Sequence, residues 1–490
     1  MYALLLGHET KTLVRAPAFS WILLLLAAAV AIGAWAGGEH LARIERGAAY
    51  ATQDALADRE KLRGDLERYE QRVAARGESV QIAAYSHTQR GEVPQGTNAG
   101  SVGLKAPEIA VLPATGIQAF AVGQSDLLLS YVPVTTAGLT TALQASEMGN
   151  PVNLKRGPFD LSFVVIFLLP IFILAISYDM LSSEKERGTL AMVLANPLSL
   201  SKLMSSKVVS RALIILAVIV ALGLGSLLTV GSALGSADTW TRFGLWLAAT
   251  LLYAVFWFLL SVLVNALGRN SATNGIILAG AWLAFVVVTP TLVSVWATTA
   301  YPAPSRFDFI TASRAAQTES EGNFMRELDQ YYYDHVEYVP NERVNDFLSV
   351  TRAKNEAVDR AVAPLWAQFR TQLAKQDELV ARFQFLSPAI MMQRVLNDVT
   401  GVSAARYQRF VDQVQAFREE WTSFFTRRFL TEQAMRSSDF NSFPSFRYVE
   451  EPIGEVMKRA LPSIAGIVLI LVVLAGGAFG ALRRYQVAAR

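Results

Sequence analysis

The chain has 490 residues, of which 52% are hydrophobic and only 17% charged, and its formal net charge is +3. A soluble protein of this size carries more charge, so the composition predicts a polytopic membrane protein, and the small net charge argues against a nucleic-acid partner. The sequence contains no cysteine, which excludes disulfides, thiol catalysis and cysteine metal ligands.

The amino-terminal residues 1–16 combine leucines with charged side chains such as Glu9. This pattern predicts a helix that lies along the membrane surface, although a frayed leader fits it equally well. Residues 17–38 then form a charge-free run with Trp21 and Trp35 near its ends, which predicts the first membrane-spanning helix. The run is too long for the core of a signal peptide, so no cleavable leader is expected.

Residues 39–158 form the first of two long polar insertions. In the charge-rich segment 39–76, apolar side chains recur at steps of four and three, at Leu62, Leu66, Tyr69 and Val73. This spacing predicts a long amphipathic helix that continues out of the membrane. The segment 110–136 has short apolar runs broken by glycine and proline, which favours brief strands or an irregular packed lobe.

Apolar runs predict five further membrane-spanning helices, at residues 159–180, 201–236, 241–267, 271–300 and 459–482. Between the last two lies the second polar insertion, 301–458, with helical patterns over 342–376 and 403–435. The long helix of the first insertion is expected to pack on helices of the second. This packing would bury Leu66 and Phe417 in one shared core.

The orientation follows from the lysines and arginines near the ends of the spans. These residues gather in the amino-terminal segment, between the second and third spans and in the tail 483–490, whereas the loop between the third and fourth spans has only Arg242. Both termini are therefore expected in the cytoplasm and both insertions outside it, in the inner (plasma) membrane of a bacterium. The predicted fold class is mainly α, with six membrane-spanning helices and a largely helical extracytoplasmic lobe that contains some short strands.

Residues 181–200, between the second and third spans, are called the elbow below. They contain a charged patch, a glycine and a short amphipathic segment that Pro197 ends. The candidate site residues are Glu184, Lys185, Glu186, Arg187, Gly188, Thr189 and Leu190. A mixed-charge surface helix between two membrane helices suits a force-transmitting contact with a soluble partner. The alternative is an ordinary solvated loop.

Motifs for chemistry are scarce in this sequence. It has no G-x-x-x-x-G-K-[ST] phosphate loop, and its histidines lack metal-ligand spacing, at His8, His40, His87 and His335. We therefore expect no catalytic residue, metal site or bound cofactor in this chain. Because no charged residue lies in the middle of a span, an intramembrane proton or ion relay is not expected either. The energy source is expected on another subunit.

Two aromatic clusters also bear on function. Asp334 and His335 lie beside three tyrosines, an arrangement more typical of a solvated helix surface than of a ligand site. Trp246, Tyr253 and Trp257 recur at helical spacing in the fourth span, which favours a packing or lipid-facing seam over a substrate-binding box.

The elbow sequence SSEKERGTLAMVLANPLS, within residues 160–211, resembles the loop between the second and third membrane helices of ABC-2 type permeases, the membrane subunits of one class of ABC transporter. A second stretch, VGQSDLLLSYVPV at 122–134, resembles a subgroup whose extracytoplasmic insertions have no assigned function. The resemblance implies a six-helix subunit that works as a dimer, mostly in export, with a cytoplasmic ATPase that holds ATP and Mg. It also implies that the elbow is the coupling helix, seated in a groove of that ATPase.

The sequence thus favours the permease subunit of an ATP-driven transporter, either an exporter or a force-transmitting complex. The alternative is a membrane scaffold or receptor whose outer domains bind a partner without transport, but such a protein has no need of the elbow. Members of the resembled family typically have short outer loops. The long insertions are therefore expected to dock a periplasmic or outer-membrane partner, or to close over the exit of the pathway. The substrate does not follow from the sequence.

Overall fold

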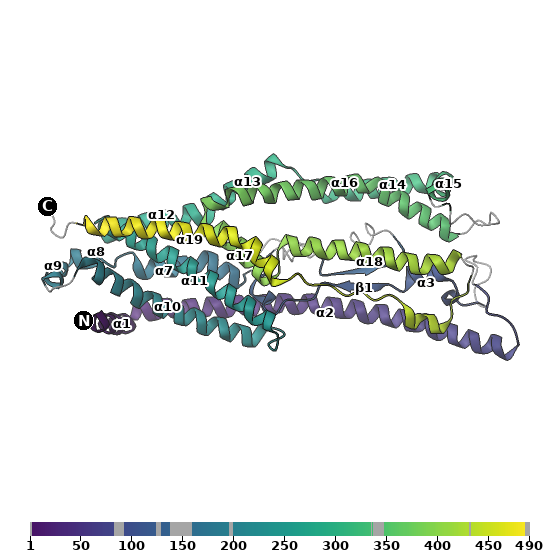
Figure 1. Ribbon diagram of the computed structural model, residues 1–490, viewed down its shortest axis with the longest axis horizontal. Helices are drawn as coiled ribbons and strands as arrows, with labels where there is room; N and C mark the ends of the chain where they lie inside the picture. The colour runs from purple at the N-terminus through teal and green to yellow at the C-terminus, as the bar shows by residue number, and fades with distance from the viewer. Residues whose placement is uncertain are drawn as a thin grey trace.

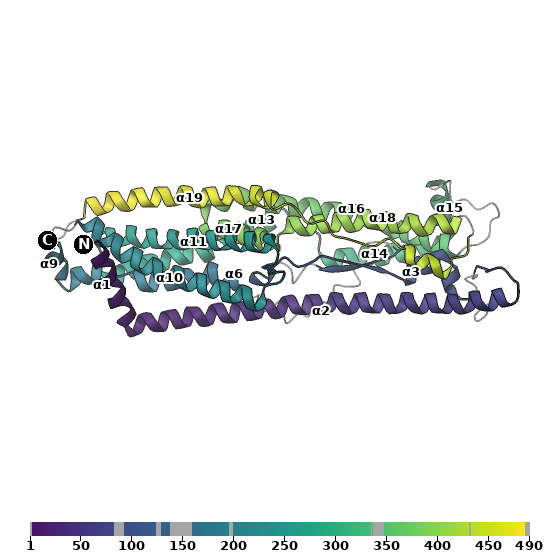
Figure 2. The ribbon, with the colours of Figure 1, turned by 60° about the horizontal axis from the view of Figure 1, so that its bottom comes forward.

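The computed structural model describes residues 2–82, 93–123, 129–137, 159–195, 199–334, 336, 347–430 and 433–485. The predictions made for Pro197, His87, His335 and residues 124–128, 342–346 and 486–490 lie outside the described residues. The molecule is elongated, with a bundle of long helices at one end and a helical lobe at the other (Figure 1). The elbow and both described ends of the chain lie together at the end of the bundle that is remote from the lobe, here called the elbow end (Figure 2).

Six helical segments of the described chain are long and apolar enough to cross a membrane, as the hydropathy pattern predicts. They are α2 (Pro17–Ala75), α6 to α8 (Leu161–Glu186), α10 (Leu200–Val230), α11 (Ala237–Ala266), α12 to α13 (Ser271–Ala300) and α19 (Ile453–Arg483). The predicted third span, 201–236, is too long at its carboxyl end. The chain after Val230 turns at Ala233, which has a positive φ of 51°, and Ser236 then caps α11 through the backbone N–H of Asp238.

Helix α1 (Tyr2–Arg15) precedes the first span and folds back beside the bundle (Figure 2). Helix α2 then runs without a break for 59 residues, or about 88 Å at 1.5 Å per residue. A bilayer core needs only about 20 of those residues, so the remainder extends into the lobe. The predicted amphipathic helix over 39–76 is thus the lobe part of α2 and is continuous with the first span.

Two spans contain a π-helical turn that ends two residues before a proline, Pro170 in one span and Pro290 in the other. One comprises η4 (Val164–Leu168), between α6 (Leu161–Phe163) and α7 (Leu169–Ser177), and the other comprises η5 (Leu283–Val288), between α12 (Ser271–Trp282) and α13 (Thr289–Ala300). Proline has no N–H to donate, so nearby carbonyls lose their usual partner. In the second span a side chain replaces it: the Tyr253 hydroxyl donates to the carbonyl of Ile166, four residues before Pro170, at 3.0 Å. Trp282 Nε1 also donates to the neighbouring carbonyl of Phe167, at 3.1 Å.

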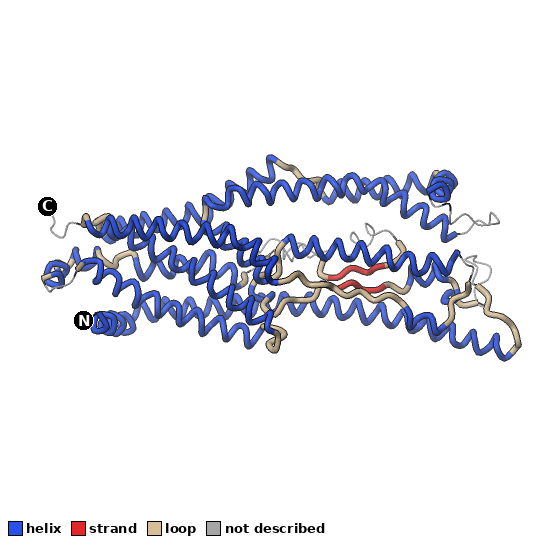
Figure 3. Tube along the Cα trace, viewed as in Figure 1, coloured by secondary structure: helices blue, strands red, loops and turns tan. Residues whose placement is uncertain are grey.

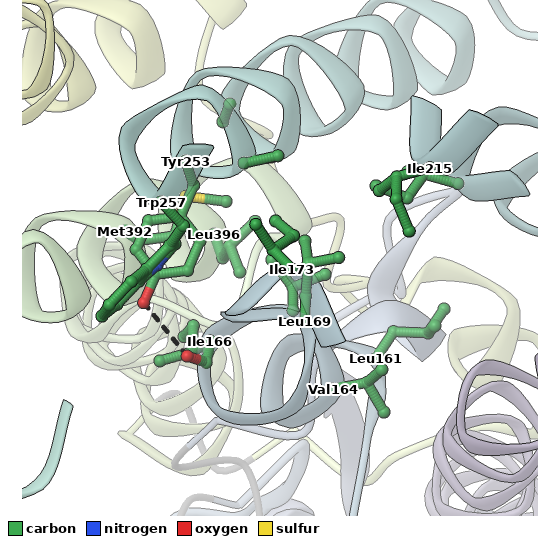
Figure 4. Close-up of a cluster of buried hydrophobic side chains, with 14 of the residues drawn as sticks. Leu161, Val164, Ile166, Leu169, Ile173, Ile215, Tyr253, Trp257, Met392 and Leu396 are labelled. Carbon is green, nitrogen blue, oxygen red and sulfur yellow. Dashed lines mark hydrogen bonds between the residues drawn. The ribbon is translucent and has the colours of Figure 1, made fainter. Parts of the chain in front are cut away.

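The core of the bundle is built around α11. Its Trp246, Tyr253 and Trp257 are each at most 2% exposed, which confirms that the aromatic stripe is a packing seam. Figure 4 shows Tyr253 and Trp257 facing Ile166 and Ile173 of the second span, with Met392 and Leu396 alongside. The last two residues come from α17 (Pro388–Thr400), a short helix that our sequence analysis does not predict.

The lobe joins both insertions, as predicted. The outer half of α2 packs with α3 (Ala99–Lys105), α18 (Ala404–Leu430) and a two-stranded antiparallel sheet, β1 (Glu108–Val111) and β2 (Tyr131–Val134). In this sheet Glu108 pairs with Val134, and Figure 3 shows the strands between the lobe helices. Leu66 and Phe417 are buried in one hydrophobic cluster, so the two insertions share a core.

A long helical arm lies beside the lobe (Figure 1). It consists of α14 (Arg306–Gly322), α15 (Phe324–Asp334) and α16 (Phe347–Phe383), and the first two of these helices are not predicted from the sequence. The arm has a small core of its own around Phe309 and Val362. An ion pair between Asp359 and Arg418, at 3.2 Å, ties it to α18.

Candidate functional site

The elbow folds as two short helices, α8 (Ser182–Glu186) and α9 (Thr189–Leu194), and not as one. Gly188 separates them with a φ of +72°, a left-handed conformation that costs other residues about 1–2 kcal/mol. Nothing lies within 4 Å of the position a Cβ would occupy there. The glycine is therefore required by the turn itself and not by crowding.

One side of the elbow is tied to the start of the fifth span. The Glu186 carboxylate accepts from the Ser271 backbone N–H at 2.6 Å and from the Ser271 hydroxyl at 3.0 Å. These contacts place a negative charge on the amino terminus of α12, where the helix dipole favours it. Lys185 donates to the carbonyl of Gly268 at 3.2 Å, just before that helix.

The opposite side of the elbow is tied to α10 and α1. The Lys207 ammonium lies 2.7 Å from a Glu184 oxygen and 2.8 Å from a Glu9 oxygen. The Lys207 side chain is only 7% exposed. Arg211, one turn further along α10, donates to the carbonyl of Ile176 at 2.7 Å and so reaches the second span. The elbow thus contacts two different groups of helices through two different carboxylates.

A buried network of hydrogen bonds joins the start of the elbow and the end of the second span to α11. The Asn265 side chain accepts from the Leu181 N–H at 3.2 Å and donates to the Ser177 carbonyl at 3.0 Å. The hydroxyls of Ser177 and Ser261 lie 2.9 Å apart. Because each of these polar groups is satisfied within the bundle, the elbow is a rigid extension of the spans and not a loose loop.

The seven predicted site residues divide into two groups in this arrangement. Glu184, Lys185 and Glu186 bond within the chain, and Leu190 is buried against Met180, Leu181 and Leu203. Arg187, Gly188 and Thr189 are exposed at the tip. Met192 of α9 is 74% exposed beside this tip, although the sequence did not predict it as a site residue. On the same helix Leu190 is buried and Leu194 half-buried, and no signal in the sequence distinguishes Met192 from these apolar neighbours.

A second polar assembly lies at the other end of the bundle, where the lobe begins. Three arginines from three helices converge on the carboxyl end of α17. Arg242 of α11 donates to the Val399 carbonyl at 3.1 Å, and Arg406 of α18 donates to the Gly401 carbonyl at 3.1 Å. Cations at this position are favoured because the carboxyl end of a helix carries a partial negative charge.

The third arginine, Arg459 of α19, makes a two-pronged pair with Glu451, at 2.6 and 2.7 Å, and donates to Asp398 at 3.1 Å. Burial favours the neutral form of both carboxyl groups. For Asp398 burial prevails over Arg459 and raises its pKa, whereas for Glu451 the bonds to Arg459 outweigh burial and lower its pKa. The junction therefore joins α11, α17, α18 and α19 through charge.

Within the described part of the chain, no three histidine, aspartate or glutamate side chains are grouped so that they could hold a metal ion. Tyr331 packs against Leu328 and Ala353 in a small cluster of the arm, and Tyr333 is exposed. The polar groups that do converge are at the elbow and at the lobe junction. Both arrangements hold helices together.

The comparisons with known proteins agree with this description. A family model described as "ABC-2 family transporter protein" matches residues 3–484. The chain is also similar to the "Probable ABC transporter permease protein NosY" of Stutzerimonas stutzeri, with 33% identity over 168 residues, which are 33% of this chain and 59% of that relative. The aligned part thus spans little more than half the length of the relative. Because the family model covers nearly the whole chain, the protein belongs to the ABC-2 transporter family and is a membrane subunit of an ABC transporter.

Proposed function

We propose that this chain couples ATP hydrolysis on a separate, soluble ATPase subunit to movement of its own membrane helices, and that this movement exports a substrate or transmits force. ATP and Mg would be held by the ATPase. The observation that carries the proposal is the construction of the elbow. Its inner side chains are bonded to the spans, while Arg187, Thr189 and Met192 stay exposed at the end of the bundle.

The exposed tip has the composition of a protein-binding surface. Arginine and methionine are enriched at protein interfaces, and here they flank a glycine turn that carries no bulky side chain. A groove with an apolar wall and a carboxylate would complement Met192 and Arg187. Because the elbow is already fixed by Glu184 and Glu186, little conformational entropy is lost when a partner binds.

The surroundings of the elbow favour a cytoplasmic position. Lysine and arginine are concentrated at the elbow end of the bundle, so this end is assigned to the cytoplasm and the lobe to the outside of the inner membrane. The α12–α13 span buries only 17% of its most apolar window within the chain. A second copy of the chain, or a related permease, is proposed to cover part of this span.

Co-purification tests the proposal directly. The unmodified chain, extracted in detergent from its native membrane, is expected to retain a soluble ATPase. The double variant Arg187→Glu with Met192→Asp is expected to insert normally but to lose this ATPase about tenfold or more, because like charge and a buried carboxylate oppose docking. The control Arg43→Glu reverses an exposed charge at the lobe end and is expected to retain the ATPase.

Two outcomes would contradict the proposal. Normal ATPase retention by the double variant would show that the elbow is not the docking surface. Absence of any ATPase with the unmodified chain would favour the alternative of a scaffold or receptor that works without ATP hydrolysis.

The assigned orientation has its own test, which the absence of native cysteine makes clean. Cysteines introduced singly at Ser79 and Ser438 of the lobe, both exposed, are expected to react with an impermeant maleimide in intact spheroplasts. A cysteine at Ser205, exposed beside the elbow, should react only after the membrane is opened. Labelling of the Ser205 position from outside would overturn the orientation.

A further inference from the structure

Lys207 occupies an unusual place in the bundle. Its ammonium joins the charged groups of three separate elements: Glu9 of α1, Glu184 of the elbow, and α10, on which Lys207 itself lies. All three side chains are largely withdrawn from solvent. The groups that face this cation are thus the two carboxylates, with the Arg211 guanidinium 4.0 Å from Glu9.

The burial of this cluster decides how it responds to movement. An exposed ion pair can be exchanged for water at little cost, but a buried carboxylate that loses its cation is left poorly solvated. Separation of Glu184 from Lys207 is therefore disfavoured throughout any displacement of the elbow. The elbow and α10 are held together as one body at this point.

The cluster is continued along α10. Arg211 donates to the carbonyl of Lys207, one turn back, and to that of Ile176 in the second span. A displacement that reaches Lys207 is thus passed to the neighbouring turn of α10 and to α7. On the opposite side of the elbow, Glu186 bonds to the start of α12 and has no part in this cluster.

We propose that Lys207 is a positioning residue of the coupling step: it makes α10 and the surface helix α1 follow the elbow, separately from the route through Glu186 to α12. The proposal rests on the proposed function, since the elbow must be moved by an ATPase for coupling to occur. It adds that two carboxylates only two residues apart, those of Glu184 and Glu186, act on different helices. It also gives α1 a role, as a brace that holds Lys207 from its other side through Glu9.

The first test uses the chain alone in nanodiscs, with amide hydrogen exchange as the readout. Glu184→Gln is expected to raise exchange in α8 and α9 about tenfold and to leave exchange in α1 unchanged. Glu9→Gln is expected to raise exchange in α1 about tenfold and to leave exchange in α8 and α9 unchanged. Lys207→Met should raise both, and Lys207→Arg should restore protection. Lys202→Met, an exposed change on the same helix, serves as the control. Unchanged exchange in Lys207→Met would overturn the proposal.

The second test uses the complex with the ATPase that co-purifies, with and without trapping by ADP and vanadate. Spin labels on introduced cysteines report two distances: from Thr229, at the lobe end of α10, to Leu461 on α19, and from Ala195, exposed just after α9, to Arg484. Trapping is expected to change both distances in the unmodified chain. In Glu184→Gln the elbow distance should still change, and the α10 distance should change less than half as much.

The outcomes of the second test separate the two proposals. An α10 distance that changes fully in Glu184→Gln but not in Glu186→Gln would overturn the role of Lys207 and leave the proposed function intact. Failure of the unmodified chain to hold an ATPase would overturn the proposed function. It would also overturn coupling through Lys207, even if hydrogen exchange showed that the cluster stabilises the elbow and α1.

Discussion

Replacement of Arg406 by methionine should loosen the lobe from the bundle. The Arg406 side chain is 1% exposed, and it bonds to the Glu450 carboxylate at 2.6 and 2.9 Å. It also donates to the carbonyls of Gly401, at 3.1 Å, and Pro113, at 2.7 Å. These partners belong to three segments that are distant in sequence, so one guanidinium holds the base of α18 in place.

The magnitude follows from what the variant leaves behind. Glu450 is about a third exposed, so it regains water and its loss of the arginine is expected to cost about 1–2 kcal/mol. The two carbonyls lose buried donors at about 1 kcal/mol each. Methionine fills most of the vacated space, which keeps the cavity cost small. A loss of about 3–4 kcal/mol in local stability is expected.

Hydrogen exchange at the start of α18 is the assay. A loss of this size corresponds to about 100- to 1,000-fold faster exchange of those amides through local opening, while amides of α7 and α11 should stay unchanged. Arg409→Met changes an exposed arginine of the same helix and is expected to stay within about 0.5 kcal/mol of the parent chain. A loss below about 1 kcal/mol in Arg406→Met would show that other contacts hold the lobe, and would refute the reasoning.

Three further predictions concern single residues. Leu66→Ala should cost about 2–5 kcal/mol in the lobe, measured by the thermal unfolding of the chain in detergent, because Leu66 is fully buried in the core shared by both insertions. Gly188→Ala should cost about 1–2 kcal/mol at the elbow and raise its hydrogen exchange without changing exchange in the lobe. Glu451→Gln should destabilise the junction at neutral pH, and the penalty should fade as the pH falls below about 4, because Arg459 lowers the pKa of Glu451 and its stabilisation is lost as this carboxyl is protonated. A penalty that is independent of pH would contradict that ionic role.

The features that repeat along the chain were predictable from the sequence. A charge-free run of about 20 residues has few structures available to it in a membrane, and the fifth span, 271–300, coincides with its predicted bounds. The steps of four and three at Leu62 to Val73 predicted the helix of the lobe and the face that it buries. Where an uncharged loop follows a span, hydropathy continues through it, and the third span was therefore drawn six residues too long.

Helix α17 was missed although its ends are marked. Ser387 caps it, Pro388 occupies its first turn, and Gly401 follows with a φ of +82°, which are the usual signals for the start and end of a helix. Its apolar residues lie within the polar insertion 301–458, and the helix is too short, at 13 residues, for their helical spacing to stand out from the surrounding sequence. The arginine contacts at its end could not be predicted, since Arg406 and Pro113 are 293 residues apart.

The sequence predicted a candidate site at the elbow as a cluster of charge between two spans, but it could not say which of these charges form bonds inside the molecule. Glu184 and Glu186 are two residues apart on α8, and only the fold shows that one bonds to Lys207 and the other to Ser271. The charge reversal that the sequence alone would suggest, at Glu186 and Arg187 together, would therefore damage the start of α12 as well as the docking tip. Substitution of both Arg187 and Met192 is therefore expected to test the proposed docking without disturbing these internal bonds.

The two polar assemblies also constrain how movement can cross the bundle. Charged contacts fix the helices at the elbow end and at the lobe junction. Between these ends the helices are joined by apolar packing and by a few uncharged hydrogen bonds, such as that from Tyr253 to the Ile166 carbonyl. Movement applied at the elbow must therefore travel along the helices as nearly rigid bodies. Helix α2 is the longest of these, and its Gly37 lies so close to the Ala119 carbonyl that a Cβ there would clash. Because α2 is continuous into the lobe core, a tilt of its membrane half about this contact would displace the lobe in the opposite direction.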